Sequence, residues 1–408
     1  MTGRINNTAK DLRRDLFLKL REELRSDLRE AETDRAAEPE ERIRALIERE
    51  RYAGNLSRFE RRSLASALKG SVQGLDVLED LLADPEVSEI MVNGPDRIFI
   101  EKAGRIHCLD RRFESEERLE DAIRRIVGSC NRVISESSPI ADARLADGSR
   151  VNAVISPVAL DGPVLTIRHF PDDPVTMKDL MAFGTVTPEA AFFLQRLVEA
   201  SYSFMISGGT SAGKTTFLNA LSLYIPEEER VVTIEDNAEL QLQKIPDLVR
   251  LEAKAANMEG NAAITIRDLI RTALRMRPDR LLIGEVRGAE AAELLMALNT
   301  GHEGSLSTIH ANSAGDVVPR LLTLALMGMR LPEETILSQI ASGIDILVHL
   351  SRLPDKSRKV MEITEIVGME AGHVRLNPIF ARENGTGDLR RCGELLDKSK
   401  LIRKGVML

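Results

Sequence analysis

The chain has 408 residues, of which 43% are hydrophobic and 29% are charged. This is the balance of an ordinary globular protein, and the length predicts two or three domains. The net charge is −8, and the chain has no Trp, three Tyr and 11 Phe. These values argue against a protein that coats nucleic acid, because such proteins usually present a basic face and aromatic platforms for the bases.

The cysteines and the apolar runs exclude further classes of protein. Cys108, Cys130 and Cys392 are odd in number and far apart, so neither a disulfide framework nor a four-cysteine zinc site is expected. The N-terminus is charged from Arg4 onward and has no apolar signal core. No apolar run approaches the roughly 18 residues of a membrane span. We therefore expect a cytoplasmic protein that contacts a membrane only through partners.

The first part of the chain divides into two regions that differ in composition and in the pattern of apolar residues. Residues 1–74 are rich in Arg and Glu, with Leu at every fourth position from Leu12 to Leu28. This pattern predicts a charged helical region, either a small bundle or a solvated, partly disordered arm. Residues 75–170 combine alternating apolar strands with a periodic helix, which predicts a smaller α+β domain. The segment 171–186 begins with a polar, proline-bearing stretch and is predicted to be a linker.

The larger domain is expected over residues 187–370, where apolar strands alternate with helical segments. This alternation is typical of a parallel sheet with helices on both faces, and ligands bind such sheets beyond the carboxyl ends of the strands. Residues 371–408 are expected to form a C-terminal tail, with a turn near 384–387 and a basic segment near 398–404. Strands are predicted at residues 203–207, 231–235, 281–285, 305–309 and 344–350.

A phosphate-binding loop is the most specific motif of the sequence. Residues 208–215 read Gly-Gly-Thr-Ser-Ala-Gly-Lys-Thr and match G-x-x-x-x-G-K-[ST] at every fixed position. A strand pattern precedes the loop and a helix pattern follows it, which favours a nucleotide site over a glycine-rich turn that binds nothing. Lys214 can reach the β- and γ-phosphates, and the Thr215 hydroxyl can ligate Mg²⁺. The predicted nucleotide-binding residues are Gly208, Gly209, Thr210, Ser211, Ala212, Gly213, Lys214, Thr215 and Thr216.

Two further strands deliver carboxylates to the same edge of the predicted sheet. Glu235 ends one apolar run, and Glu285 ends another, Leu281-Leu282-Ile283-Gly284, which has the shape of a Walker B element. Phosphoryl transfer needs a carboxylate that orients and deprotonates water, while Mg²⁺ takes only one or two protein ligands. We therefore predict Thr215 and Glu285 as metal ligands and Glu235 as the base. The residues alone do not divide these two roles between Glu235 and Glu285.

Histidines and arginines complete the candidate catalytic set. His302 and His310 lie in a turn rich in Gly and Thr, where they could sense the γ-phosphate, although a lone His is more often a satisfied core or surface residue. Arg150 and Arg168 lie on predicted strands of the smaller domain, and arginines delivered onto a nucleotide from a second domain would close the site. Another set, Arg267, Arg271 and Arg275, shares one helical face, which is typical of a solvated face.

Together these motifs resemble the ATPases of type II secretion, type IV pilus and type IV secretion machines, and within them the Tad (tight adherence, Flp) pilus assembly ATPases. The resemblance covers about residues 75–370. Unlike type II secretion and many type IV pilus assembly ATPases, this chain has no four-cysteine zinc element, as in the Tad and type IV secretion branches. The segments that carry the resemblance are 89–94, 142–152, 165–168, 208–216, 233–239, 266–269, 274–278, 283–289, 299–313 and 363–369.

The resemblance implies a RecA-like P-loop ATPase domain that uses ATP and Mg²⁺, within a homo-hexamer that carries ATP at its subunit boundaries. It also implies docking on inner-membrane platform proteins and a function in powering pilus assembly. The alternatives are a type IV secretion ATPase, a nucleic-acid translocase with the same core, and a scaffold that binds nucleotide without hydrolysing it. By resemblance, Glu235 belongs to the family's Asp box, Glu285 to its Walker B box, His302 and His310 to its His box, and Arg150 and Arg168 to positions that reach the phosphates.

Overall fold

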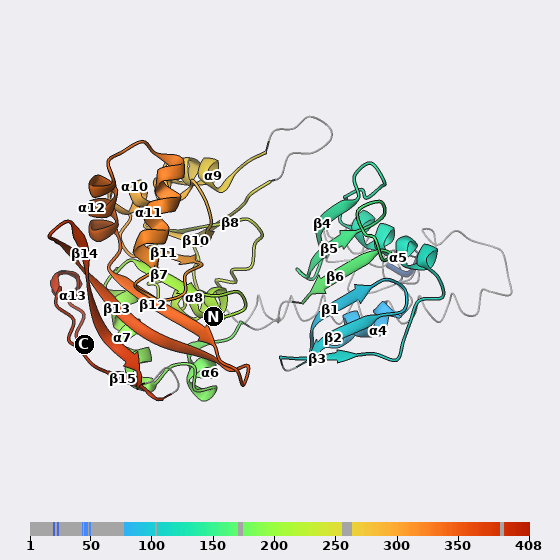
Figure 1. Cartoon of the computed structure of the whole chain (residues 1–408), viewed down its shortest axis with the longest axis horizontal. Coiled ribbons are helices and arrows are strands. Elements are labelled where there is room, and N and C mark those ends of the chain that lie inside the picture. The colour runs from blue at the N-terminus through green and yellow to red at the C-terminus, as the bar shows by residue number, and fades with distance from the viewer. Residues whose placement is uncertain are drawn as a thin grey trace. The chain divides into compact units, whose positions relative to one another are not determined.

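The computed structural model describes residues 77–102, 104–169, 174–254, 263–383 and 387–408, together with isolated positions between residues 19 and 49. The helical region expected over residues 1–74 lies almost entirely outside these residues, and so does most of the turn expected near 384–387. The described chain forms two compact units, the first ending at residue 169 and the second beginning at residue 174 (Figure 1).

The first unit is a six-stranded antiparallel sheet with the strand order β3-β2-β1-β6-β5-β4 (Figure 1). Buried and exposed positions alternate in β5, where Val151 and Ala153 are buried and Asn152 between them is exposed. Helix α5 begins where the Ser115 hydroxyl accepts a hydrogen bond from the Arg118 N–H. The elements are α4 (Leu78–Ala83), β1 (Val87–Asn93), β2 (Ile98–Lys102), β3 (Arg105–Cys108), α5 (Glu116–Ser129), β4 (Ile140–Arg144), β5 (Arg150–Val154) and β6 (Val164–Arg168).

The second unit is built on a nine-stranded sheet with the order β15-β14-β13-β12-β7-β11-β10-β8-β9 (Figure 1). The six strands from β12 to β9 in this order are parallel. The strands are β7 (Phe204–Gly208), β8 (Val231–Glu235), β9 (Leu248–Glu252), β10 (Arg280–Val286), β11 (Leu306–Ile309), β12 (Ile346–Arg352), β13 (Arg358–Glu370), β14 (His373–Arg382) and β15 (Leu389–Arg391). The helices are α6 (Met177–Ala182), α7 (Pro188–Glu199), α8 (Lys214–Ser222), α9 (Ile266–Ala273), α10 (Ala291–Leu298), α11 (Val317–Gly328), α12 (Glu333–Gly343) and α13 (Ser399–Lys404).

Helices cover both faces of this sheet, which explains why its central strands are apolar throughout. Every residue of β7 is buried. Phe204 and Ile206 belong to the apolar cluster that includes residues of α7 and α8. Met205, which points to the opposite face, belongs to the cluster that includes residues of α9 to α12.

The C-terminal residues differ from the expected tail, because they continue the sheet instead of leaving it. Strands β13, β14 and β15 pair antiparallel with one another and with β12, so the sheet is mixed and not purely parallel. Ala371 and Gly372, both with positive φ, form the two-residue turn between β13 and β14. The segment expected to be a linker contains α6, and β9 forms where no strand was predicted.

The end of the chain is fastened to the sheet by a buried carboxylate. Glu365 of β13 is 1% exposed. Its oxygens accept hydrogen bonds from the backbone N–H groups of Leu396 and Asp397 and from the amide of Asn377. Nearby, the Tyr202 hydroxyl donates to the Asp397 carbonyl at 2.6 Å. These bonds make residues 394–397 part of the second unit.

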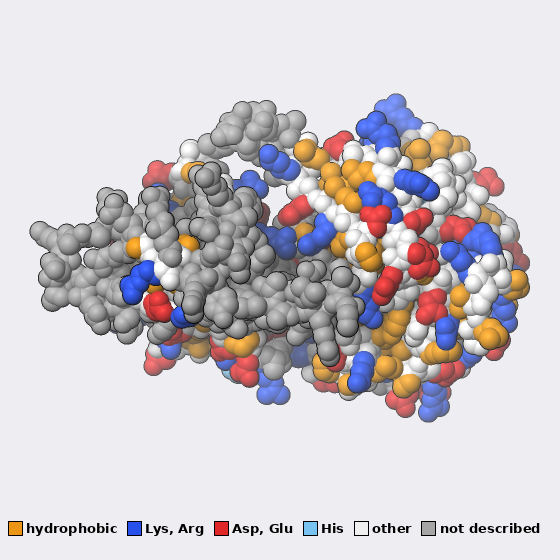
Figure 2. Space-filling view, turned by 180° about the vertical axis from the view of Figure 1, so that it is seen from behind, with side chains coloured by type: hydrophobic (Ala, Val, Ile, Leu, Met, Phe, Trp, Pro, Cys, Tyr) orange, Lys and Arg blue, Asp and Glu red, His pale blue; other side chains and the backbone are white. Residues whose placement is uncertain are grey.

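The described surface carries both signs of charge. On the face drawn in Figure 2, acidic and basic side chains are interspersed with apolar ones over the described residues. Within those residues, no helix has both the length and the apolar character needed to cross a bilayer.

Candidate nucleotide-binding site

The phosphate loop joins the end of β7 to the first turn of α8. Gly213 precedes α8 with φ of 92°, a left-handed conformation that favours glycine. An added Cβ at Gly213 would lie 3.2 Å from Cδ of Arg358. The Nε of Arg358 in turn donates to the Ser211 carbonyl at 3.0 Å. The first residue of β13 therefore packs across the loop, a contact that the sequence did not reveal.

Lys214 is the first residue of α8, and its side chain reaches back to the start of the loop. Its Nζ donates to the carbonyls of Gly208 at 3.2 Å and Gly209 at 3.1 Å, and lies 3.4 Å from both ring nitrogens of His310. Burial lowers the pKa of Lys214, and the charge of Glu285 opposes this effect. The ammonium of Lys214 is thus bound to two loop carbonyls. A phosphate group of a nucleotide can take their place as its partner.

Glu235 ends β8 and is almost completely buried, with 2% of the residue exposed. Its Oε1 accepts hydrogen bonds from the backbone N–H groups of Glu239 and Leu240, at 2.8 and 2.9 Å. No described residue hydrogen-bonds with its Oε2. Burial raises the pKa of Glu235 to about 7, although the two backbone hydrogen bonds act in the opposite direction. This carboxyl can therefore exchange a proton near neutral pH.

Gly284 of the neighbouring strand β10 packs closely against Glu235. A Cβ on Gly284 would lie 3.0 Å from Cγ of Glu235 and 3.4 Å from its Oε1. The glycine of the Walker B pattern is thus required by the close approach of β8 to β10. One residue later, Glu285 lies at the same edge of the sheet.

Glu285 lies beside a histidine and an arginine, although its Oε1 has no hydrogen-bond partner among the described residues. Its Oε1 lies 2.7 Å from Nε2 of His310, and its Oε2 accepts from Arg287 at 2.6 Å. Arg287 also lies 3.7 Å from Asp236. Burial lowers the pKa of His310, Glu285 raises it, and Lys214 lowers it again. Lys214, His310, Glu285 and Arg287 therefore form one connected cluster beside the loop.

The structure does not bring His302 to this cluster. His310 follows β11, whereas His302 precedes it, and parallel strands place these two positions at opposite edges of the sheet. The Nδ1 of His302 lies 3.1 Å from the Ala297 carbonyl. A catalytic role for His302 stays a prediction.

Arg150 and Arg168 lie side by side in the first unit. They are direct partners across β5 and β6, so their side chains share one face of that sheet. Arg168 is also opposite Glu89 across β1 and β6. Their approach to a nucleotide held by the second unit stays a prediction.

The donor set at the loop suits Mg²⁺. This ion prefers oxygen ligands and keeps several waters. The Thr215 hydroxyl lies in the first turn of α8 and the Glu285 carboxylate lies at the carboxyl end of β10, so each element end supplies an oxygen. No cluster of three or more His, Cys, Asp or Glu side chains with metal-site geometry occurs in the described residues. The described residues therefore suit a Mg²⁺ ion that one or two protein groups hold.

The arginine face predicted to be solvated on α9 is partly wrong. Arg267 and Arg271 both bond Oε1 of Glu293 on α10, at 2.6 and 2.8 Å. The Glu293 side chain is only 7% exposed, so the two arginines neutralise a nearly buried carboxylate. They connect α9 to α10 instead of facing water alone.

Comparisons with known proteins agree with these features. Residues 71–392 match the family model of type II/IV secretion system proteins. A Mycobacterium tuberculosis protein whose provisional name refers to conjugal transfer is 35% identical over 327 residues, 79% of this chain and 92% of that protein. The type IV secretion system protein PtlH of Bordetella pertussis is 31% identical over 73% of this chain and 95% of its own length. The corresponding values for VirB11 of Brucella suis are 32%, 68% and 84%. The chain belongs to the type II/IV secretion system protein family.

Solved structures share the fold. The pilus retraction motor PilT with bound ADP superposes with a TM-score of 0.54 at 20% identity, covering 73% of this chain and 84% of that chain. The ATPase DotB of Legionella pneumophila gives a TM-score of 0.50 at 20% identity, with 71% and 78% covered. At this identity, the likeness extends to the mixed α/β fold.

Proposed function

We propose that this chain is a Mg²⁺-dependent ATP hydrolase that works as the motor of a pilus or secretion machine. The observation that carries the proposal is the convergence of Lys214, Glu235, Glu285 and His310 at the carboxyl ends of four strands. His310 contacts Lys214 of the loop, Glu285 contacts His310, and Glu235 packs against Gly284, the residue before Glu285. Membership of the secretion family supports the same activity.

The residues divide the work of hydrolysis between them. Loop N–H groups and Lys214 bind the phosphates. Thr215 and Glu285 would hold Mg²⁺, which would neutralise charge that develops on the phosphate oxygens. Glu235 accepts a proton from the attacking water through its unpartnered Oε2. The water oxygen bonds to the γ-phosphorus while the bond to the bridging oxygen breaks, and that electron pair leaves with ADP.

Glu235 and Glu285 each have one oxygen with no hydrogen-bond partner among the described residues, so hydrogen bonding does not separate their roles. The pKa favours Glu235 as the base. A base works best when its pKa is close to the operating pH, and the pKa of Glu235 is about 7.

Movement requires that ATP bind one arrangement of the protein more tightly than another. We propose that the paired Arg150 and Arg168 of the first unit contact the γ-phosphate, so that ATP favours a closed arrangement. To shift the equilibrium from mostly open to mostly closed, ATP must bind the closed arrangement more favourably by about 5.5 kcal/mol. Two arginines on a terminal phosphate are one source of it.

For the biological setting, we propose a cytoplasmic homo-hexamer that docks on inner-membrane platform proteins and powers Tad/Flp pilus assembly. A type IV secretion ATPase is the second candidate, which the identity to PtlH and VirB11 supports. In the source organism, replacing Lys214 by Ala should remove surface pili under the first proposal. Under the second, pili remain and transfer of the secreted substrate stops.

The activity itself is tested with purified protein by phosphate release from MgATP. Lys214→Ala should abolish turnover and weaken nucleotide binding, because the loop loses its charge on the β- and γ-phosphates. Lys244→Ala, an exposed lysine of the same unit, is the control and should leave the rate unchanged. Turnover that persists in Lys214→Ala would refute the proposal. A mass measurement with a non-hydrolysable ATP analogue tests the hexamer, and stimulation by DNA or RNA would instead favour a translocase.

A further inference from the structure

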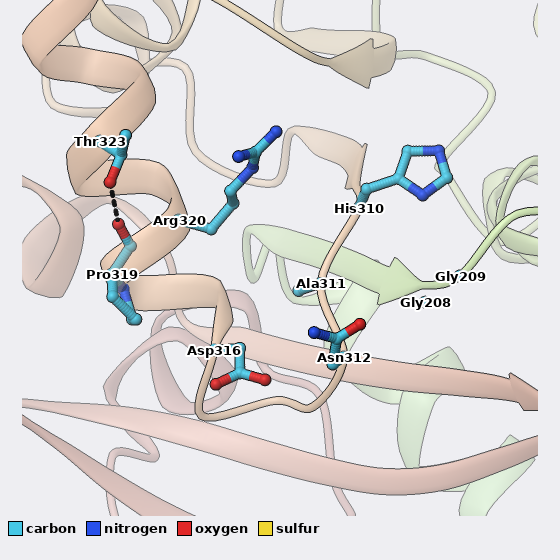
Figure 3. A pocket seen from close by; sticks show the side chains of 9 residues that line it. All are labelled: Gly208, Gly209, His310, Ala311, Asn312, Asp316, Pro319, Arg320 and Thr323. Atoms are coloured by element: carbon cyan, nitrogen blue, oxygen red, sulfur yellow. Dashed lines mark hydrogen bonds between the residues drawn. The ribbon is translucent and has the colours of Figure 1, made fainter.

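A cavity of about 440 Å³ opens beside the phosphate loop (Figure 3). Its wall combines the first residues of the loop, the turn after β11 and the first half of α11. The lining residues are Gly208, Gly209, His310, Ala311, Asn312, Asp316, Pro319, Arg320 and Thr323. All of them belong to the second unit.

Arg320 brings an uncompensated charge to this cavity. Asp316 lies one helical turn before it, a spacing at which ion pairs commonly form. The structure nevertheless shows no ion pair or side-chain hydrogen bond of Arg320 with any described residue. Figure 3 shows the Arg320 side chain directed toward His310 and away from Asp316. Its charge contributes to lowering the pKa of His310, which agrees with this direction.

The other polar groups of the wall differ in what they can bind. The amide of Asn312 likewise has no hydrogen-bond partner among the described residues, so it offers two donors to the cavity. The Thr323 hydroxyl is already used, because it donates to the Pro319 carbonyl at 2.9 Å. Asp316 adds one carboxylate, which opposes an anion.

The position of the cavity relates it to the end of the nucleotide. Lys214 contacts the carbonyls of Gly208 and Gly209 and also His310, and all three of these residues line the cavity. Since Lys214 of a phosphate loop reaches the β- and γ-phosphates, the cavity continues outward from the terminal phosphate. In hydrolysis, the γ-phosphorus moves away from ADP and toward the attacking water.

We propose that this cavity binds inorganic phosphate, the product cut from ATP, with Arg320 as its counter-ion and Asn312 as a second donor. The inference rests on the proposed function and deepens it. The volume exceeds that of one phosphate and leaves room for waters that bridge it to the wall. The carboxylate of Asp316 weakens the site, so the phosphate is held briefly and then released.

The test measures phosphate binding directly, so it does not depend on turnover. Radiolabelled inorganic phosphate is equilibrated by dialysis with the full chain, with and without MgADP, and fluorescent ADP is titrated in parallel. The variants are Arg320→Ala, Arg320→Lys and Asp316→Asn. Arg330→Ala is the matched control, because it removes an exposed arginine just beyond α11 that does not line the cavity.

We expect Arg320→Ala to weaken phosphate binding about 10- to 100-fold, the effect of losing a hydrogen bond to a charged group. Arg320→Lys should retain part of the affinity and Asp316→Asn should increase it. The ADP affinity should change less than about twofold in all of them, and Arg330→Ala should match the wild type.

Several results would overturn the proposal. They are the absence of phosphate binding to the wild type, equal binding by wild type and Arg320→Ala, and a parallel loss of ADP affinity in Arg320→Ala. A parallel loss of ADP affinity would show that Arg320 binds the diphosphate of ADP and not the released phosphate. Failure of the proposed function looks different, since a wild type that binds phosphate through Arg320 but never cleaves ATP refutes hydrolysis alone.

Discussion

Replacing Glu235 by Gln should make the protein more stable at alkaline pH while it stops ATP turnover. Burial raises the pKa of this carboxyl from an ordinary 4.5 to about 7. Since one pKa unit corresponds to about 1.36 kcal/mol, the ionised carboxylate destabilises the fold by about 3 kcal/mol above pH 7. Glutamine has the same shape and no charge to desolvate, so it should recover most of that free energy.

The sign of the pH dependence follows from proton binding. Between pH 4.5 and 7, the folded protein binds more protons at Glu235 than the unfolded chain does. The stability contribution is therefore complete at low pH and is lost as the pH rises through about 7. The variant lacks this loss, so its advantage should be about 3 kcal/mol at pH 8.5 and close to zero at pH 4.5.

Urea unfolding followed by tyrosine fluorescence measures this difference. The chain has no Trp and three Tyr, and Tyr202 and Tyr224 both belong to the second unit. Glu228→Gln, which neutralises an exposed carboxylate three residues before β8 begins, serves as the control and should not change the free energy of unfolding. A gain that is equal at both pH values, or absent at pH 8.5, would refute the reasoning. Nucleotide binding should persist in Glu235→Gln, and wild-type turnover should fall below about pH 7.

Two further substitutions test the supports of the site and of the sheet. Gly284→Ala places a Cβ 3.0 Å from Cγ of Glu235. It should slow hydrolysis and lower stability by about 1–3 kcal/mol, whereas Gly128→Ala, where a Cβ meets nothing within 4 Å, should do neither; wild-type rates in Gly284→Ala would contradict this contact. Glu365→Ala leaves the N–H groups of Leu396 and Asp397 without their acceptor and should cost about 2–4 kcal/mol, with faster proteolysis near residue 396. Glu370→Ala removes a carboxylate from an exposed ion pair and should change stability little; equal proteolysis of both variants would show that Glu365 does not fasten this segment.

The sequence predicted the parts of the site that lie within continuous motifs. The loop at 208–215 and the acids at the ends of β8 and β10 follow from local patterns, and the strand expected at 231–235 has the bounds of β8. The remaining parts depend on pairs that are distant in the sequence. Arg358 contacts the Ser211 carbonyl from 147 positions away, and no local pattern marks such a residue. Arg287 had a better signal, since it follows the Walker B glutamate by two positions.

The dependence on distant pairs also explains why the C-terminal residues were predicted to be a tail and not strands. Their strands are recognisable only through their pairing, of β14 with β13 and of β15 with β14, because β14 is half-exposed and contains Pro378. The solvated face predicted for α9 failed for a related reason. Its arginines meet Glu293, which is 22 and 26 positions away and on another helix. Helical periodicity identifies a face but not what covers it.

The position of β7 in its sheet has a consequence for how the protein is made. This strand, which carries the phosphate loop, pairs on one side with β11 and on the other with β12, both encoded far downstream. Synthesis must therefore reach residue 352, the end of β12, before the loop has both of its neighbours. Until then the nascent chain exposes an apolar strand with two open edges, a species prone to aggregate. The phosphate loop is thus supported on both sides only after strands more than 90 residues downstream have been synthesised.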